Sequence, residues 1–225
     1  MDWCDKPENR MEWRRRLKGC NLCVTKGCST PPSAGPRYGT GKLYQPEVAF
    51  VATNPPADLS RAQEGAFMLH YPRSMDELRT RPEFLMLKLV ERLGLQPMDV
   101  YATQVVKCPT STNTVCSQMV EDCTERWLTE ELTALAPRVI VCLGYIARLG
   151  THDYASMRWD LKSQARTPDT WLCKGTSDRV PETHLRIYRN QGWVHLPHPS
   201  TVGRFCDQGD WLTFATEAIN KARGV

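Results

Sequence analysis

Short hydrophobic runs divide the chain into alternating strands and helices. Three of these runs, Val48 to Ala52, Val100 to Val106 and Arg138 to Gly144, are rich in β-branched residues and predict buried strands. A fourth strand is predicted from Arg186 to Leu196. Because helical segments separate these runs, the pattern predicts right-handed crossovers and a three-layer α/β/α sandwich with a central, mostly parallel four-stranded sheet.

The helices are predicted from apolar residues that recur every three or four positions. One is expected over Pro82 to Gly94, with proline at the favoured first helical position. Another is expected to begin with Ser117 as its N-cap and to place Cys123 on its inner face. A helix that begins over Tyr145 to Leu149 and a terminal helix over Trp211 to Arg223 complete the alternation.

Length and composition favour a single domain, which we expect to span residues 1–225. The chain has 225 residues, 41% of them hydrophobic, which is enough for one well-packed core and too few for two. It lacks an eighteen-residue apolar stretch and a signal-peptide core, so we expect a soluble, cytoplasmic monomer without membrane contact. Residues 151–185 are polar and show no periodicity, and are expected to form an enlarged loop region. The formal net charge of +4 is compatible with a nucleic-acid partner but too small to indicate one.

Cysteines at three places in the chain suggest a shared metal or iron–sulfur site. Cys20 and Cys23 form a CxxC pair, while Cys108 directly follows a predicted strand. Cys123 lies early on a predicted helix. In a chain of this size without a signal peptide, such thiols are more often metal ligands than disulfide partners. These two pairs of thiols would supply the four thiolates that a zinc ion or an iron–sulfur cluster requires.

Polar residues at strand ends are the candidates for chemistry. Asn54 follows the first buried strand, and His198 follows the last predicted strand. In open parallel sheets ligands bind beyond the carboxyl ends of the strands, so both side chains are expected at that edge. Taken alone, each residue also fits a structural role, since asparagine before prolines is a common turn residue.

Three motifs together give the chain a family resemblance over most of residues 17–204. They are Val51 to Pro56, Val105 to Cys108 and His198 to Ser200, each at the end of a predicted strand. With the four cysteines, this arrangement resembles the uracil-DNA glycosylase superfamily and, in its cysteine layout, the iron–sulfur branch called family 4. The resemblance implies a DNA-repair enzyme. Such an enzyme flips a uracil or modified pyrimidine out of DNA and hydrolyses its N-glycosidic bond to leave an abasic site.

The same resemblance implies a 4Fe-4S cluster as the cofactor. The expected ligands are the four cysteines named above, Cys20, Cys23, Cys108 and Cys123. Residues 1–45 would then be a cluster-binding segment. Zinc on the same four thiolates is the alternative cofactor, and replacement of one ligand by Cys28 or Cys116 is a further alternative.

Base excision requires stabilisation of both parts of the breaking bond. Negative charge grows on the departing base, and positive charge grows on the sugar. A hydrogen-bond donor aimed at the base stabilises the leaving group, and removing such a donor costs about a hundredfold to a thousandfold in rate. We assign this donor to His198, and we assign the positioning of the attacking water to Asn54, with Asp58 nearby.

Further residues are expected to bind the flipped nucleotide and the DNA backbone. Phe67 resembles the family's stacking phenylalanine, and stacking on an aromatic ring is worth roughly 1–3 kcal/mol per base. Gln104 matches the position that reads the base edge. Arg204 is expected on a phosphate, with Val202 or Phe205 as a wedge in the minor groove. The expected substrate-binding residues are Thr53, Phe67, Gln104, Ser200 and Arg204.

Departures from the family pattern affect the expected substrate. The first motif reads ATNPP in place of the GEAPG of the iron–sulfur branch, and is closer to the mismatch-specific and single-strand-selective branches. Gln104 stands where the family has asparagine, and its side chain is one methylene longer. We therefore expect a base other than plain uracil, such as a 5-substituted or deaminated pyrimidine. The alternatives are a non-catalytic DNA-binding or regulatory protein that keeps the fold and cluster, and a zinc-stapled interaction module.

Overall fold

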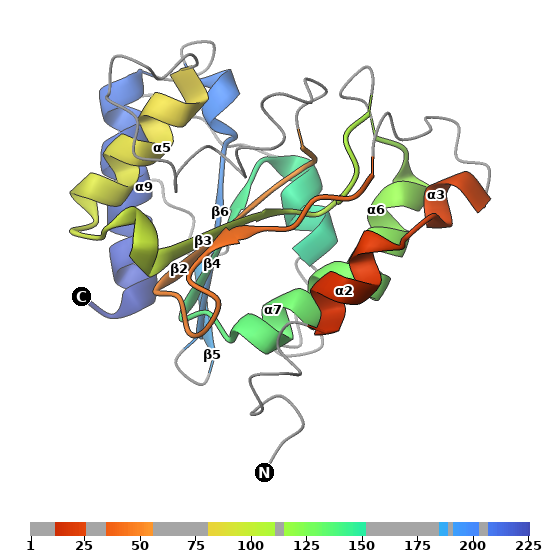
Figure 1. Ribbon diagram of the computed structural model, residues 1–225. Helices are drawn as coiled ribbons and strands as arrows, with labels where there is room; N and C mark the ends of the chain where they lie inside the picture. The colour runs from red at the N-terminus through yellow and green to blue at the C-terminus, as the bar shows by residue number, and fades with distance from the viewer. Residues whose placement is uncertain are drawn as a thin grey trace.

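A mixed β-sheet runs through the middle of the molecule (Figure 1). The computed structural model describes residues 12–25, 35–55, 81–110, 115–151, 185–188, 191–202 and 207–225. Within them, the sheet has six strands in the order β1-β3-β2-β4-β6-β5. The strands are β1 (Thr40–Gly41), β2 (Val48–Ala52), β3 (Val100–Gln104), β4 (Val139–Leu143), β5 (Leu185–Tyr188) and β6 (Gln191–Leu196).

The four inner strands, β3, β2, β4 and β6, are parallel, which confirms the predicted sheet at the centre of an α/β fold. The short outer strands add to it, because β1 pairs with β3 and β5 pairs with β6, both antiparallel. Ala52 lies opposite Gln104 in the register, and Leu143 lies opposite Leu196. The carboxyl ends of the inner strands therefore meet at one edge of the sheet.

The last predicted strand is in fact two strands. The prediction placed one strand over Arg186 to Leu196, whereas β5 and β6 form an antiparallel pair in which Tyr188 lies opposite Gln191. Apolar residues occur on both sides of Asn190, so the sequence pattern looks continuous. An asparagine between two such runs is a common turn residue, and it is the signal that the prediction missed.

Helices cover both faces of the sheet (Figure 1). Those on one face are α5 (Arg81–Arg92) and α9 (Gln208–Arg223). The other face is covered by one helical run in three parts, α6 (Ser117–Cys123), a π-helical turn (Thr124–Leu128) and α7 (Thr129–Leu135), with α2 (Glu12–Lys18) beside it. The short helical elements are α3 (Leu22–Thr25), η4 (Pro97–Asp99) and η8 (Pro199–Thr201).

The side chains of each inner strand alternate between two hydrophobic cores. All residues of β2 are buried; Val48 and Phe50 pack toward α5 and α9, whereas Ala49 and Val51 pack toward α6 and α7. Burial on both faces is typical of parallel strands and explains why β2 reads as one continuous hydrophobic run. Full burial of a side chain such as Phe50 stabilises the fold by about 1.5–3 kcal/mol.

The predicted helices are confirmed, with differences at their first residues. α5 begins at Arg81 rather than Pro82, and α9 begins at Gln208 rather than Trp211. Cys116, rather than Ser117, is the N-cap of α6, because Cys116 still has an extended backbone and Ser117 is the first helical residue. None of the helices in the described part of the chain is long and apolar enough to span a membrane. The division into a cluster-binding segment and an enlarged loop region stays a prediction, since residues 1–11, 26–34 and 152–184 lie outside the described residues.

Candidate functional site

The edge formed by the carboxyl ends of β2 and β3 continues as two adjacent segments beyond the strands. The Val105 amide donates to the Ala52 carbonyl (2.8 Å), and the Val106 amide donates to the Thr53 carbonyl (2.9 Å). Asn54 follows directly, half-buried, and its Nδ2 donates to the Pro55 carbonyl at 3.1 Å. The turn at Thr53 and Asn54 is therefore held against the segment that leaves β3.

Gln104 is the last residue of β3, and its side chain is only 4% exposed. Among the described residues, no donor reaches its Oε1. Leaving a buried polar atom unpaired costs about 1–3 kcal/mol, so such an atom in a folded protein calls for an explanation. A ligand that donates a hydrogen bond at this strand end would supply one.

His198 is held by the short helix that it caps. The Ser200 amide donates to His198 Nδ1 at 3.2 Å, and Ser200 Oγ lies 2.7 Å from the same nitrogen. Because a backbone N–H can only donate, Nδ1 must be unprotonated, and the neutral ring carries its proton on Nε2. Burial lowers the pKa of His198 to about 4, so this neutral form is the one present near pH 7. His198 is thus an uncharged donor through Nε2.

Gly144 connects the end of β4 to His198. Its amide donates to the Leu196 carbonyl (2.8 Å), and its φ of +87° lies in the left-handed region that favours glycine. A Cβ placed on Gly144 would lie 3.2 Å from the Cβ of His198. Gly144 was not predicted as a site residue, although a glycine directly after a buried strand was the available signal.

Four neighbouring strands therefore bring polar or glycine residues to one edge. The spatial order is Gln104 at the end of β3, Asn54 after β2, Gly144 after β4 and His198 after β6. This is the arrangement expected for the strand-end motifs, with Thr53 and Ser200 adjacent to them. Three predicted site residues, Asp58, Phe67 and Arg204, lie outside the described residues, as does Phe205.

The expectation that Val202 could wedge into DNA is wrong. Val202 is 2% exposed and packs in the core with α5 and α9. A branched apolar side chain in a short loop is equally suited to a core or a wedge, and the sequence does not distinguish them.

The four predicted cysteine ligands lie near one another on the face of the sheet that α6 and α7 cover. Cys20 lies just before α3 and Cys23 lies within it, Cys108 follows β3, and Cys123 ends α6. Cys23 and Cys123 belong to the same buried core, and Cys20 packs against it. In Figure 1, α2 and α3 accordingly lie beside α6 and α7.

The four thiols influence one another electrostatically. Burial, together with the nearby Cys23 and Cys20, raises the pKa of the Cys108 thiol to about 12, whereas Arg37 opposes the shift. A hydrogen bond with Cys23 lowers the pKa of Cys123 despite its burial. Each of the four thiols thus interacts with at least one other.

Trp127 adds a contact that sequence analysis missed. Its Nε1 donates to Cys20 Sγ at 3.3 Å. The guanidinium groups of Arg16 and Arg126 lie 5.9 and 5.6 Å from its ring centroid, within cation–π range. The available signal was its spacing, since Trp127 stands four positions after Cys123 on the same helical run.

The thiol cluster fits an iron–sulfur group by its chemistry. Among the described residues, no three His, Cys, Asp or Glu side chains converge closely enough to enclose a single metal ion. Four cysteine thiolates are the donor set that holds a four-iron cluster, and Cys20, Cys23, Cys108 and Cys123 would supply it. Cys116 is half-buried and packs against the same core, so its role as a replacement ligand stays open, and Cys28 lies outside the described residues.

Comparisons with known proteins agree with the strand-end motifs. A family model described as Uracil DNA glycosylase superfamily matches residues 38–220. A 64-residue segment is 39% identical to the Type-4 uracil-DNA glycosylase of Archaeoglobus fulgidus. That segment covers 28% of this chain and 32% of the relative, so the similarity spans about a third of the relative's length. The family match includes Cys108 and Cys123 and begins after Cys20 and Cys23.

Proposed function

The chain belongs to the uracil DNA glycosylase superfamily, and from this membership we propose that it is a DNA glycosylase. It flips a uracil or modified pyrimidine out of DNA, hydrolyses the N-glycosidic bond and leaves an abasic site. The observation that carries the proposal is the meeting of Gln104, Asn54 and His198 at the carboxyl edge of one parallel sheet.

His198 is the residue that stabilises the leaving base in this proposal. Its Nδ1 is occupied by Ser200, so the neutral imidazole donates through Nε2 to the O2 atom of the base. A donor held in place before the reaction needs no reorganisation as negative charge develops, which is why its loss costs about a hundredfold to a thousandfold in rate. Burial keeps the ring uncharged near neutral pH.

Asn54 is the residue that positions the attacking water. Its Nδ2 is engaged by the Pro55 carbonyl, which orients the amide and leaves Oδ1 as the atom to accept a hydrogen bond from water. Asp58 is the second candidate for this role, and Phe67 remains the candidate for stacking on the flipped base. Arg204 remains the candidate for phosphate binding.

Gln104 determines which base is accepted in this proposal. The amide carries a donor and an acceptor, as needed to read the Watson–Crick edge of a pyrimidine, and its Oε1 lacks a donor among the described residues. Because glutamine is one methylene longer than asparagine, a base held in the family's usual place would be crowded. The proposed substrate is therefore DNA that contains a 5-substituted or deaminated pyrimidine.

A 4Fe-4S cluster is the proposed cofactor, with zinc as the alternative. Four neighbouring thiols support it, those of Cys20, Cys23, Cys108 and Cys123. When bound, the cluster would tie the N-terminal segment to the loop after β3 and to α6. Visible absorbance together with iron and sulfide analysis separates a cluster from zinc.

A panel of oligonucleotides tests the proposal. Single- and double-stranded DNA carrying uracil, thymine, hypoxanthine or 5-modified pyrimidines is incubated with the protein, and base release is measured. The proposal requires release of at least one pyrimidine, and a slower release of that base by Gln104→Ala. DNA binding without release of any base would instead support the non-catalytic DNA-binding alternative.

A further inference from the structure

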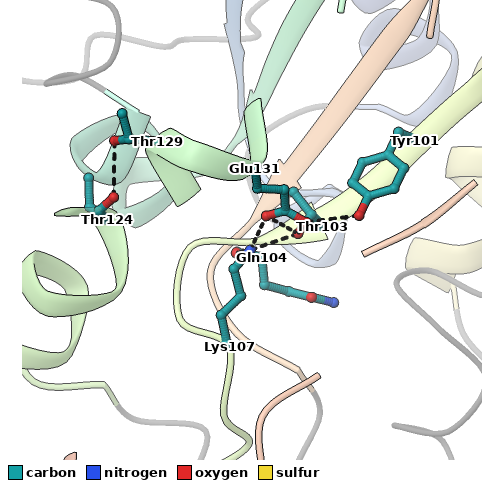
Figure 2. Close-up of polar contacts among 7 residues, drawn as sticks. All are labelled: Tyr101, Thr103, Gln104, Lys107, Thr124, Thr129 and Glu131. Atoms are coloured by element: carbon teal, nitrogen blue, oxygen red, sulfur yellow. Dashed lines mark hydrogen bonds and ion pairs between the residues drawn. The ribbon is translucent and has the colours of Figure 1, made fainter. Parts of the chain in front are cut away.

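A buried ion pair holds the turn that links Gln104 to Cys108. Lys107 on this turn pairs with Glu131 of α7, and both residues have zero exposure (Figure 2). The Tyr101 hydroxyl donates to Glu131 Oε1 at 2.9 Å, and the Thr103 hydroxyl lies 3.0 Å from the same oxygen. Glu131 therefore receives hydrogen bonds from β3 as well as the charge of Lys107.

The remaining N–H groups of Lys107 donate hydrogen bonds to the last two residues of β3. Its Nζ donates to Thr103 Oγ1 at 2.8 Å and to the Gln104 carbonyl at 2.6 Å. With Glu131, these contacts use all three donors of the ammonium group. Lys107 thus holds the Gln104 carbonyl in place, while the Gln104 side chain points away from Glu131 in Figure 2.

The same helical run also reaches the thiols. Cys123, Trp127 and Glu131 follow one another at intervals of four residues through the π-helical turn. Cys123 belongs to the thiol group, Trp127 donates to Cys20, and Glu131 holds Lys107. This helical run therefore interacts with Lys107 through Glu131 and with Cys108 through Cys123.

We propose that Lys107 and Glu131 form a positioning pair that fixes the Gln104–Cys108 turn and thereby orients the Gln104 amide toward the base. The proposal rests on the proposed function for its link to base selection. Burial of a charged pair is weak evidence for stability, because apolar replacement of both partners is often neutral or stabilising. Apolar side chains cannot, however, donate a hydrogen bond to the Gln104 carbonyl.

Four variants separate positioning from folding. Glu131→Gln and Lys107→Met each leave one buried charge without its partner, so both are expected to be less stable than the parent. The double variant Lys107→Met/Glu131→Gln removes both charges, and its amide oxygen at position 131 still accepts from Tyr101 and Thr103. Glu130→Gln is the matched control, because Glu130 is the neighbouring residue and pairs with Arg16 at the surface.

Hydrogen exchange tests the positioning without reference to activity. Exchange of backbone amides is measured for peptides that cover residues 104–108 and, as reference, 48–52. In the double variant, protection of residues 104–108 should fall by about tenfold, while residues 48–52 and the control variant match the parent. Equal protection of residues 104–108 in parent and double variant would overturn the proposal.

Base selection tests the link to Gln104. Single-turnover excision is measured on the best base and on a second base, and metal content and DNA binding are measured on the same preparations. A purely structural loss lowers both rates equally, whereas a misplaced amide should lower the ratio of the two rates by about tenfold. An unchanged ratio would overturn the link. If the parent releases no base, the proposed function fails, and the exchange experiment still decides whether the pair holds the turn.

Discussion

Gly144 and His198 lie beside each other at the ends of two parallel strands, β4 and β6. A Cβ on Gly144 would lie 3.2 Å from the His198 Cβ, at a backbone φ of +87°. Contact with a side chain would shift the residue that we assign as the donor to the leaving base. The absence of a side chain at position 144 is thus a condition for the placement of His198.

Gly144→Ala should slow excision by about tenfold or more, because a small displacement of a catalytic group is costly. It should also lower the free energy of unfolding by about 1–3 kcal/mol, since alanine is strained at positive φ. Gly94→Ala is the control, because Gly94 has a φ of +67° with open space around it. Single-turnover rates and thermal unfolding are compared. Equal losses of activity in both variants would contradict the contact with His198.

His198 should make the free energy of unfolding depend on pH. Burial lowers its pKa from 6.5 to about 4, so between these values the unfolded chain binds a proton that the folded chain does not. Stability from this source is present above pH 6.5 and is lost as the pH falls toward about 4, by up to about 3 kcal/mol before discounting partial solvent exposure. His198→Gln should flatten this slope in urea unfolding. Parallel slopes for parent and variant would contradict the burial of a neutral ring.

Gln104→Met should separate stability from function. The substitution keeps the approximate shape of the side chain and removes a buried oxygen that lacks a donor among the described residues. The free energy of unfolding should therefore stay equal or rise by about 1 kcal/mol. Excision should fall by about a hundredfold, because the base edge loses its polar partner. A less stable variant with normal excision would be the opposite result and would remove Gln104 from the site.

Trp127→Phe should weaken retention of the proposed 4Fe-4S cluster. The variant keeps an aromatic ring between Arg16 and Arg126 but loses the hydrogen bond to Cys20 Sγ. Loss of the group to a chelator, followed by visible absorbance, should be several-fold faster, as expected for a bond worth about 1 kcal/mol.

The control for this substitution is Trp211→Phe. Trp211 loses an equivalent indole hydrogen bond, to the Pro197 carbonyl at 3.2 Å, but lies in the core on the opposite face of the sheet. Its retention of the metal group should match that of the parent. Equal acceleration in both variants would show that general destabilisation is the cause.

The sheet and the placement of the strand-end motifs could be predicted from the sequence. Strands such as β2 are buried on both faces, so they read as continuous hydrophobic runs, and parallel pairing fixes where Asn54 and His198 lie. The short antiparallel strand β1 was not predicted, because Thr40 and Gly41 form no hydrophobic run. Neither was the separation of β5 from β6, where Asn190 was not recognised as a turn signal.

The residues that support the site were harder to predict, because charged residues such as Lys107 and Glu131 normally lie at the protein surface. Lys107 and Glu131 are separated by 24 positions, and nothing in either local pattern indicates that each is buried by pairing with the other. Glu131 does share a helical spacing with Cys123. This spacing is informative only once Cys123 has been assigned as a metal ligand. Gly144 was predicted as the last residue of a strand, whereas it directly follows β4 and adjoins His198.

The most direct test of the central claim is single-turnover base excision by the parent, His198→Ala and Asn54→Ala, with Glu217→Ala on the exposed face of α9 as control. DNA binding is measured in parallel. Our account predicts release of a pyrimidine by the parent and the control, and a loss of about a hundredfold or more in both site variants with DNA binding retained. Excision at the parental rate by both site variants would contradict the assignment of this strand-end edge as the active site.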